Sequence, residues 1–241
     1  MRAPVSLLPL QLDSVVFEAG SRRIIDGISL RLDAGPRTVI LGPNGAGKSV
    51  LLRLCHGLLA PTAGSIAWNS PGIAGGPRRH SMVFQRPVML RRSALGNVMY
   101  ALKVAGVGAA EREARAMQAL RKVGLDALAG HAARVLSGGE QQRLALARVW
   151  ALQPEVLFLD EPTASLDPGA THEIEKVIAA LHAAGTKIVM VTHNLGQAHR
   201  LGDEILFLHQ GRLVERAPAE RFLKHPASPE AAQFLEGELP W

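Results

Sequence analysis

The 241-residue chain has a single cysteine, Cys55, and no stretch of about 18 uninterrupted apolar residues. One cysteine cannot form an internal disulfide, and Cys55 is predicted to pack in the core as a small apolar side chain. Without a long apolar run, no segment is expected to span a membrane. The first ten residues lack a continuous apolar core and a small-residue cleavage site, so no signal peptide is expected. These absences make a cytosolic location the default expectation.

Long basic tracts and aromatic platforms are also absent, although the formal net charge is +6 and the sequence pI is about 10.1. The basic residues occur in short groups such as Arg22-Arg23, Arg78-Arg79 and Arg91-Arg92. A positive balance favours polyanions or an anionic membrane surface as neighbours. Because this charge is scattered, nucleic-acid binding is not predicted.

A glycine-rich segment fits the phosphate-binding pattern G-x-x-x-x-G-K-[ST]. It follows the apolar run Thr38-Val39-Ile40-Leu41, which predicts a buried strand, and it precedes a helical pattern that starts near Val50. Its glycines permit a curled backbone whose N–H groups converge on one phosphate, and the helix adds its positive dipole end. The segment comprises Gly42, Pro43, Asn44, Gly45, Ala46, Gly47, Lys48 and Ser49.

The first predicted strands form an antiparallel β layer at the N-terminus. After them strands and helices alternate along the chain, which predicts a mainly parallel sheet. Predicted strands, with a turn at 18–21, are residues 10–17, 24–32, 38–41, 64–68, 81–84, 156–159 and 187–191. Predicted helical regions are 94–123 with a break at 106–108, a helix from about 137 to 152, and one near 169–183. Residues 69–77 are expected to form a loop, and residues 217–241 a short helix with a polar tail.

Two further patterns fall at the ends of predicted elements, where such sheets bind ligands. Asp160 and Glu161 end an apolar strand, and their carboxylates suit Mg²⁺ coordination and activation of a water molecule, respectively. Taken alone, the pair could equally start a solvated loop before Pro162. Ser137-Gly138-Gly139 at a predicted helix start indicates either an ordinary helix cap or a second anion site. A second phosphate site makes sense when it faces the nucleotide of another copy.

With these motifs in this order, the chain resembles the ATP-binding subunits of ABC transporters over about residues 10–216. The segments "GPNGAGKS", "LSGGEQQRLALAR" and "VLFLDEPTASLD" match the family's Walker A, signature and Walker B/D-loop motifs. Gln85 resembles the Q-loop glutamine and His193 the H-loop histidine. The resemblance implies an α/β P-loop NTPase (RecA-like) core with an N-terminal antiparallel β layer and an inserted helical subdomain.

The resemblance also implies roles for individual residues. Glu161, His193 and Gln85 would be catalytic, and Ser49, Gln85 and Asp160 would hold Mg²⁺. Phe17 would stack on adenine, although it could instead be a core residue of its strand, and a histidine at a strand end is otherwise usually structural. The remaining ATP contacts would come from Gly42, Pro43, Asn44, Gly45, Ala46, Gly47, Lys48, Ser49 and Val50 and, across a dimer interface, from Ser137, Gly138, Gly139 and Asp167.

This chain departs from the family pattern at two positions. Val50 stands where the family often has threonine, which removes one hydroxyl near the α-phosphate. Asn194 stands where aspartate usually follows the histidine. Neither departure implies loss of activity.

The expected division is a single ABC ATPase domain, residues 1–241. Within it, 10–85 and 154–216 form the β layer and core, 86–153 form the Q-loop and helical subdomain, and 217–241 form the C-terminal helix and tail. One P-loop and one signature per chain imply a homodimer or a pair with a close relative.

The resemblance further implies transmembrane permease subunits, an extracytoplasmic substrate-binding protein and a peripheral position on the cytoplasmic membrane face. Residues 83–102 stand where such subunits contact the permease. Within them Met89-Leu90-Arg91-Arg92-Ser93, together with the segment "GKSVLLRLCHGLL", looks most like importers of tungstate and related oxyanions, with phosphate, molybdate and other importers as alternatives. A soluble ABC ATPase that acts on ribosomes or DNA is disfavoured because the chain has one ATPase unit and no heptad run. A P-loop kinase would leave Ser137-Gly138-Gly139 unexplained.

Overall fold

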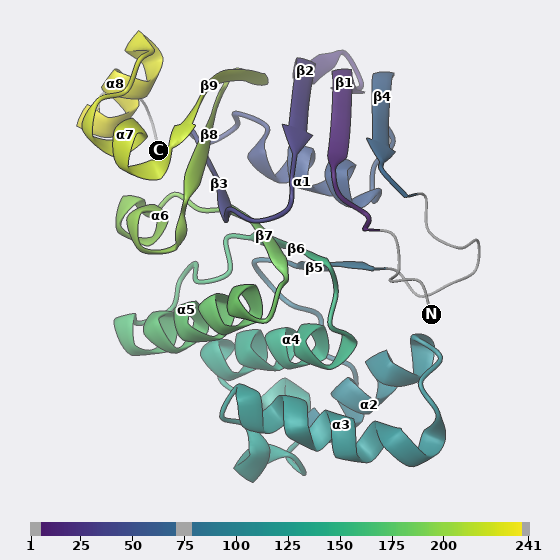
Figure 1. Ribbon diagram of the computed structural model, residues 1–241. Helices are drawn as coiled ribbons and strands as arrows, with labels where there is room; N and C mark the ends of the chain where they lie inside the picture. The colour runs from purple at the N-terminus through teal and green to yellow at the C-terminus, as the bar shows by residue number, and fades with distance from the viewer. Residues whose placement is uncertain (1–5, 71–78, 238–241) are drawn as a thin grey trace. The chain divides into compact units, whose positions relative to one another are not determined.

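The computed structural model describes residues 6–70 and 79–237, which form two compact units. Unit 1 contains the described residues within Met1–Ala74, Phe158–Asp160 and Lys187–Trp241, and unit 2 contains those within Gly75–Leu157 and Glu161–Thr186. Together they contain a mixed sheet and an antiparallel sheet, which confirms the expected α/β class (Figure 1). The division of the domain at residues 86 and 154 stays a prediction. No helix in the described ranges is long and apolar enough to cross a membrane.

The antiparallel layer belongs to unit 1 and has the strand order β2-β1-β4. Its strands are β1 (Leu10–Ala19), β2 (Arg22–Leu32) and β4 (Ala63–Trp68). The pairing of β1 with β2 runs from Leu10↔Leu32 to Ala19↔Arg22. The hairpin turn is therefore shorter than the predicted 18–21, because Glu18 and Ala19 still pair with Arg23 and Arg22.

The second sheet places its apolar strands in the centre. In unit 1 the order is β6-β7-β3-β8-β9, and β3 pairs in parallel with both β7 and β8. Every residue of β3, β6 and β7 is buried, as expected for strands covered on both faces. The strands are β3 (Thr38–Leu41), β6 (Val156–Asp160), β7 (Lys187–Val191), β8 (Glu204–His209) and the antiparallel β9 (Arg212–Pro218).

Unit 1 ends with two helices rather than the single short helix expected from the sequence. Its helices are α1 (Lys48–His56), α6 (Leu195–Leu201), α7 (Ala219–Lys224) and α8 (Pro229–Glu236). Phe222 of α7 and Phe234 of α8 pack on Phe207 of β8, with ring centroids 5.7 Å and 5.3 Å away. The prediction of a polar tail was therefore wrong for residues 229–236. These residues form α8, because the contact of Phe234 with Phe207 orders them. Residues 238–241 lie outside the described ranges.

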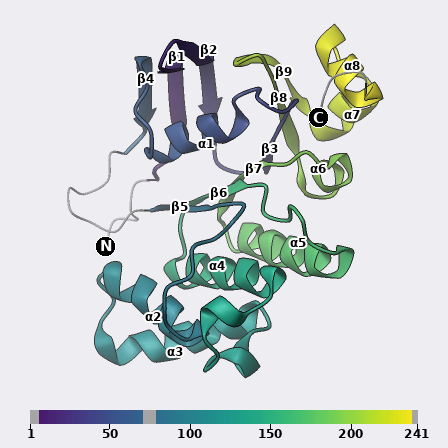
Figure 2. The same cartoon turned by 180° about the vertical axis from the view of Figure 1, so that it is seen from behind.

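Unit 2 is mainly helical, and α2, α3 and α4 pack against one another (Figure 2). The predicted break in the helical region is confirmed, since α2 ends at Val104 and α3 begins at Ala109. Most of the predicted loop at 69–77 lies outside the described residues. The elements are β5 (His80–Val83), α2 (Ala94–Val104), α3 (Ala109–Lys122), α4 (Gly138–Leu152), α5 (Pro168–Ala183) and two short 3₁₀ helices, Asp126–Leu128 and Ala133–Val135.

Candidate functional site

The glycine-rich loop of unit 1 connects β3 directly to α1. Gly42 has φ +147°, and a Cβ added there would overlap the carbonyl oxygen of Leu208. Gly47 has φ +96°, and its Cβ would lie 2.8 Å from Cδ1 of Ile25. A side chain at either position would be strained and would collide with its neighbours. The glycine pattern is therefore required by backbone conformation and by the strands around the loop.

The Lys48 side chain folds back over this loop. Its ammonium group donates hydrogen bonds to the carbonyl oxygens of Gly42, at 2.6 Å, and Pro43, at 2.9 Å. The residue is only 6% exposed. A buried, hydrogen-bonded ammonium inside a curl of backbone is a fixed positive charge suited to a phosphate group.

Ser49 and Asp160 meet beside the loop, although they are 111 positions apart in the chain. The Ser49 hydroxyl donates to Oδ1 of Asp160 at 2.6 Å, and Asp160 is 5% exposed at the end of β6. Nη2 of Arg53, one turn along α1, lies 3.8 Å from Oδ2 of Asp160. The sequence interpretation missed Arg53, and its spacing of four residues from Ser49 on one helix face was the available signal.

A hydroxyl next to a carboxylate supplies the hard oxygen ligands that Mg²⁺ prefers. Among the described residues, no group of three or more His, Cys, Asp and Glu side chains could hold a metal ion by itself. Mg²⁺ usually binds one or two protein oxygens and completes its shell with waters and phosphate oxygens. The pair of Ser49 and Asp160 fits that mode of binding.

His193 follows β7 at the same sheet edge as the loop. The parallel register pairs Ile40 with Val191, so Gly42 and His193 each stand two residues beyond that pair. His193 is exposed. Asn194 caps α6, because its Oδ1 accepts a hydrogen bond from the Gln197 amide at 2.9 Å. Asparagine is as effective an N-cap as aspartate, so this departure from the family pattern preserves the local structure.

Phe17 lies on β1 opposite Ile25, whose side chain packs close to Gly47 of the loop. Phe17 is half-buried, whereas Val15 on the same strand is fully buried. The other predicted loop residues also belong to unit 1. The Ala46 amide donates to the Pro43 carbonyl at 3.2 Å, and Val50 is half-buried in the first turn of α1.

The remaining predicted site residues belong to unit 2. Gln85 is exposed after β5 and lines a hollow of about 330 Å³ together with Gln142 and Ser165. Glu161 follows Asp160 with a left-handed φ of +46°. Non-glycine residues in this conformation are uncommon and cluster at functional sites.

Ser137 begins α4 with a capping box. Its hydroxyl accepts a hydrogen bond from the Glu140 amide at 3.3 Å, and the Glu140 carboxylate accepts one from the Ser137 amide at 2.8 Å. The Ser137 amide lowers the pKa of Glu140 below its usual value. A Cβ on Gly139 would lie 2.9 Å from Cβ of Ala170, so this glycine allows α4 to approach α5.

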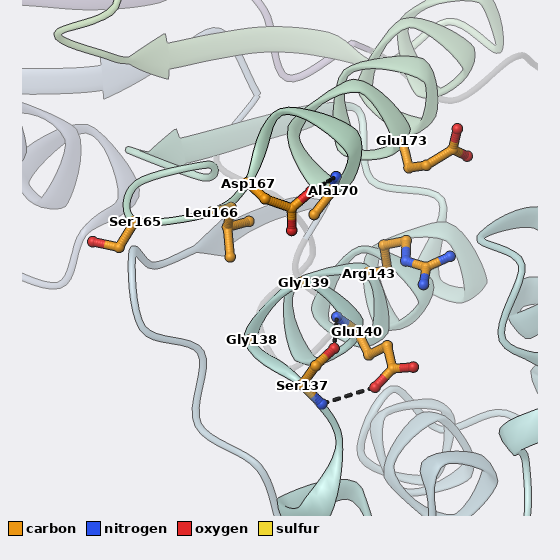
Figure 3. A pocket seen from close by; sticks show the side chains of 10 residues that line it. All are labelled: Ser137, Gly138, Gly139, Glu140, Arg143, Ser165, Leu166, Asp167, Ala170 and Glu173. Atoms are coloured by element: carbon orange, nitrogen blue, oxygen red, sulfur yellow. Dashed lines mark hydrogen bonds between the residues drawn. The ribbon is translucent and has the colours of Figure 1, made fainter.

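Asp167 begins α5 in the same way, since its carboxylate accepts a hydrogen bond from the Ala170 amide at 2.9 Å. The starts of α4 and α5 border one hollow of about 460 Å³ (Figure 3). Its lining includes Ser137, Gly138, Gly139 and Asp167, which brings together all the predicted cross-dimer contacts. The two helix N-termini that border the hollow favour an anion there through their dipoles.

Comparison with known proteins identifies the class. The family model described as "ABC transporter" matches residues 25–164, more than half of the chain. The chain belongs to the ABC transporter family, whose ATP-binding members are ATP hydrolases coupled to transport.

Individual relatives are named for the transport of different substrates. The chain is 38% identical to the methionine import ATP-binding protein MetN of Caulobacter vibrioides, with 94% of this chain and 72% of that protein covered. It is 39% identical to the tungstate uptake system ATP-binding protein TupC of Peptoclostridium acidaminophilum, with coverage of 81% and 92%. An ATP-binding subunit of an ABC transporter has the same fold, with a TM-score of 0.81, 24% identity and coverage of 95% and 99%.

Proposed function

We propose that the chain binds ATP with Mg²⁺ through the residues that the motifs predict. The loop residues from Gly42 to Val50 would surround the phosphates, with Lys48 as the fixed cation and Phe17 beside the adenine. Ser49, Asp160 and Gln85 would hold Mg²⁺. The observation that supports this most directly is the 2.6 Å hydrogen bond between Ser49 and Asp160 beside the Lys48 curl.

Hydrolysis would depend on three further side chains. Glu161 would orient and deprotonate the attacking water, and His193 would contact the γ-phosphate. Gln85 would sense Mg²⁺ and the attacking water and would connect the site to the membrane subunit. When bound, Mg²⁺ neutralises charge on the β- and γ-phosphate oxygens. The left-handed backbone of Glu161 is consistent with a side chain held for a chemical task.

Two copies of the chain would act together. The hollow beside Ser137, Gly138, Gly139 and Asp167 contains no P-loop residue, yet it presents two helix N-termini. Such a surface would receive the γ-phosphate of ATP bound by a second copy. ATP would then close a homodimer, and hydrolysis would reopen it.

The dimer would power import of an oxyanion, with tungstate as the primary candidate. The relative TupC supports that choice, and so does the resemblance of residues 47–59 and of residues 89–93 within the permease-facing segment 83–102. Within this segment Val88 is 72% exposed and Phe84 36% exposed, so apolar surface is available for a permease. A surface binding protein would deliver the substrate to the permease. The chain would lie on the cytoplasmic membrane face.

The test is the ATPase activity of the complex with its native permease and binding protein, with each substrate added in turn. The oxyanions to be tested are tungstate, molybdate, sulfate and phosphate, and methionine is included because of the relative MetN. Stimulation by tungstate alone is expected. Stimulation by methionine or phosphate alone would discard the substrate assignment and leave the ATPase assignment in place.

A further inference from the structure

The start of β2 runs alongside the phosphate-binding loop within unit 1. The carbonyl oxygen of Ile24 would lie 2.9 Å from a Cβ on Gly47. Arg22 stands two residues before Ile24, and its Nη2 lies 3.8 Å from the Cβ position of Gly45. Ile24 and Ile25 both lie against the Gly47 position and Arg22 lies against the Gly45 position, so the start of β2 follows successive glycines of the loop.

The side chain of the neighbouring Arg23 is held by two carboxylates away from the loop. Its guanidinium bonds the carboxylates of Glu18 and Asp26, each at 3.0 Å, and these two partners raise its pKa. Arg22 is exposed, and among the contacts of residues 6–70 and 79–237 its side chain has no hydrogen bond or ion pair, although its backbone pairs with Ala19. The two adjacent arginines thus differ in function: Arg23 stabilises the hairpin, whereas the Arg22 guanidinium is available at the loop.

We propose that Arg22 binds the phosphate chain of the nucleotide held by the loop. This inference rests on the proposed function and adds one residue to it. Planar guanidinium groups match the spacing of phosphate oxygens and remain charged at every relevant pH. Lys48 acts from inside the curl and Arg22 acts from the hairpin, so the two cations approach the loop from different elements. Because Arg22 is exposed, its contribution decreases with ionic strength.

Equilibrium binding of two probes to the full chain tests the assignment. Mg-ATP and inorganic tripolyphosphate with Mg²⁺ would be titrated into the wild type, Arg22→Ala, Arg22→Lys and Arg23→Ala. The Arg22→Ala variant is expected to weaken both probes by the same factor, about three- to tenfold for an exposed charge-assisted contact. Arg22→Lys should retain part of the affinity, and the matched control Arg23→Ala should stay within about twofold of the wild type.

Three results would overturn the role of Arg22. These are wild-type affinity in Arg22→Ala, equal losses in Arg22→Ala and Arg23→Ala, and a loss for ATP without a loss for tripolyphosphate. The last result would place the contact on the base or ribose. A wild-type chain that binds neither probe would overturn nucleotide binding itself, whereas normal wild-type binding with an unaffected Arg22→Ala removes only Arg22.

Discussion

The Ser49 hydroxyl donates a hydrogen bond to Asp160 at 2.6 Å and thereby joins the start of α1 to the end of β6. Both residues belong to unit 1, and they place a hydroxyl oxygen beside a carboxylate, the kinds of oxygen that hard cations prefer. This arrangement leads to the first prediction.

Replacing Ser49 by alanine should raise the Mg²⁺ concentration for half-maximal ATPase activity by about tenfold, in the range seen when metal-site interactions are lost. The measurement is a Mg²⁺ titration at saturating ATP. Ser49→Thr keeps the hydroxyl and should behave like the wild type. An unchanged half-saturating concentration in Ser49→Ala would exclude Ser49 from the metal site.

Glu161→Gln should keep ATP binding but lower turnover by about 100-fold or more, because an amide cannot accept the proton of the attacking water. ATP-bound dimer should accumulate, as measured by size-exclusion chromatography with radiolabelled ATP. Glu220→Gln, an exposed change on α7, is the control for a simple loss of carboxylate charge. Normal turnover of Glu161→Gln in a clean preparation would remove Glu161 from the catalytic role.

Gly42→Ala should destabilise the chain by about 2–4 kcal/mol, since a Cβ would overlap the Leu208 carbonyl at a left-handed φ. Thermal unfolding should move down by roughly 5–15 °C for a chain of this size. Gly130→Ala is the matched control, because Gly130 has open space around its Cβ position and no left-handed φ. Equal melting temperatures for the two variants would contradict the steric argument.

Cys55 should make stability fall at high pH. Burial raises the pKa of its thiol from 9.0 to about 12. Between these values the unfolded chain releases the thiol proton and the folded chain retains it, so folding is favoured fully below pH 9 and progressively less above it. The expected loss between pH 8 and pH 10 is about 1.4 kcal/mol, and most of it falls above pH 9.

The measurement for Cys55 is chemical denaturation at pH 8, 9 and 10 for the wild type and Cys55→Ala. The alanine variant starts less stable because of the cavity it leaves, so the comparison concerns the slopes. Identical slopes in the two proteins would show that the thiol does not titrate differently on unfolding.

Glu215 should stabilise the C-terminal helices of unit 1. Its carboxylate accepts hydrogen bonds from the Ala227 and Ser228 amides at 2.9–3.0 Å, and it is 7% exposed. Glu215→Ala would leave these donors unsatisfied, with an expected loss of about 2–3 kcal/mol and faster amide exchange in α8. Glu220→Ala, which breaks only an exposed pair with Lys224, should leave exchange unchanged.

Long apolar runs and punctuating glycines predicted most of the fold. The strand at 38–41 and the break at 106–108 are seen as expected, because buried strands and helix ends follow local composition. Helix α6 was not predicted, since seven residues after a strand give too little periodicity to distinguish a helix. The antiparallel pair of β8 and β9 was not predicted either.

The candidate site was also predicted from the sequence only in part. Motif spacing predicted each loop residue and the helix cap at Ser137. It did not indicate Arg53 beside Asp160 or Arg22 beside Gly45, because those contacts depend on how α1 and β2 lie against the loop. Sequence identity does not select the transported substrate, because relatives of nearly equal identity are named for methionine and tungstate.

The burial of Cys55 has a practical consequence for spectroscopy. Thiol-reactive dyes and spin labels require an accessible thiolate, and the one native thiol is 2% exposed with a raised pKa. The wild-type chain is therefore a ready background for labelling. A cysteine introduced at exposed Val135 would be the reactive position, and pulsed electron resonance between two labelled copies would report how nucleotide changes their separation.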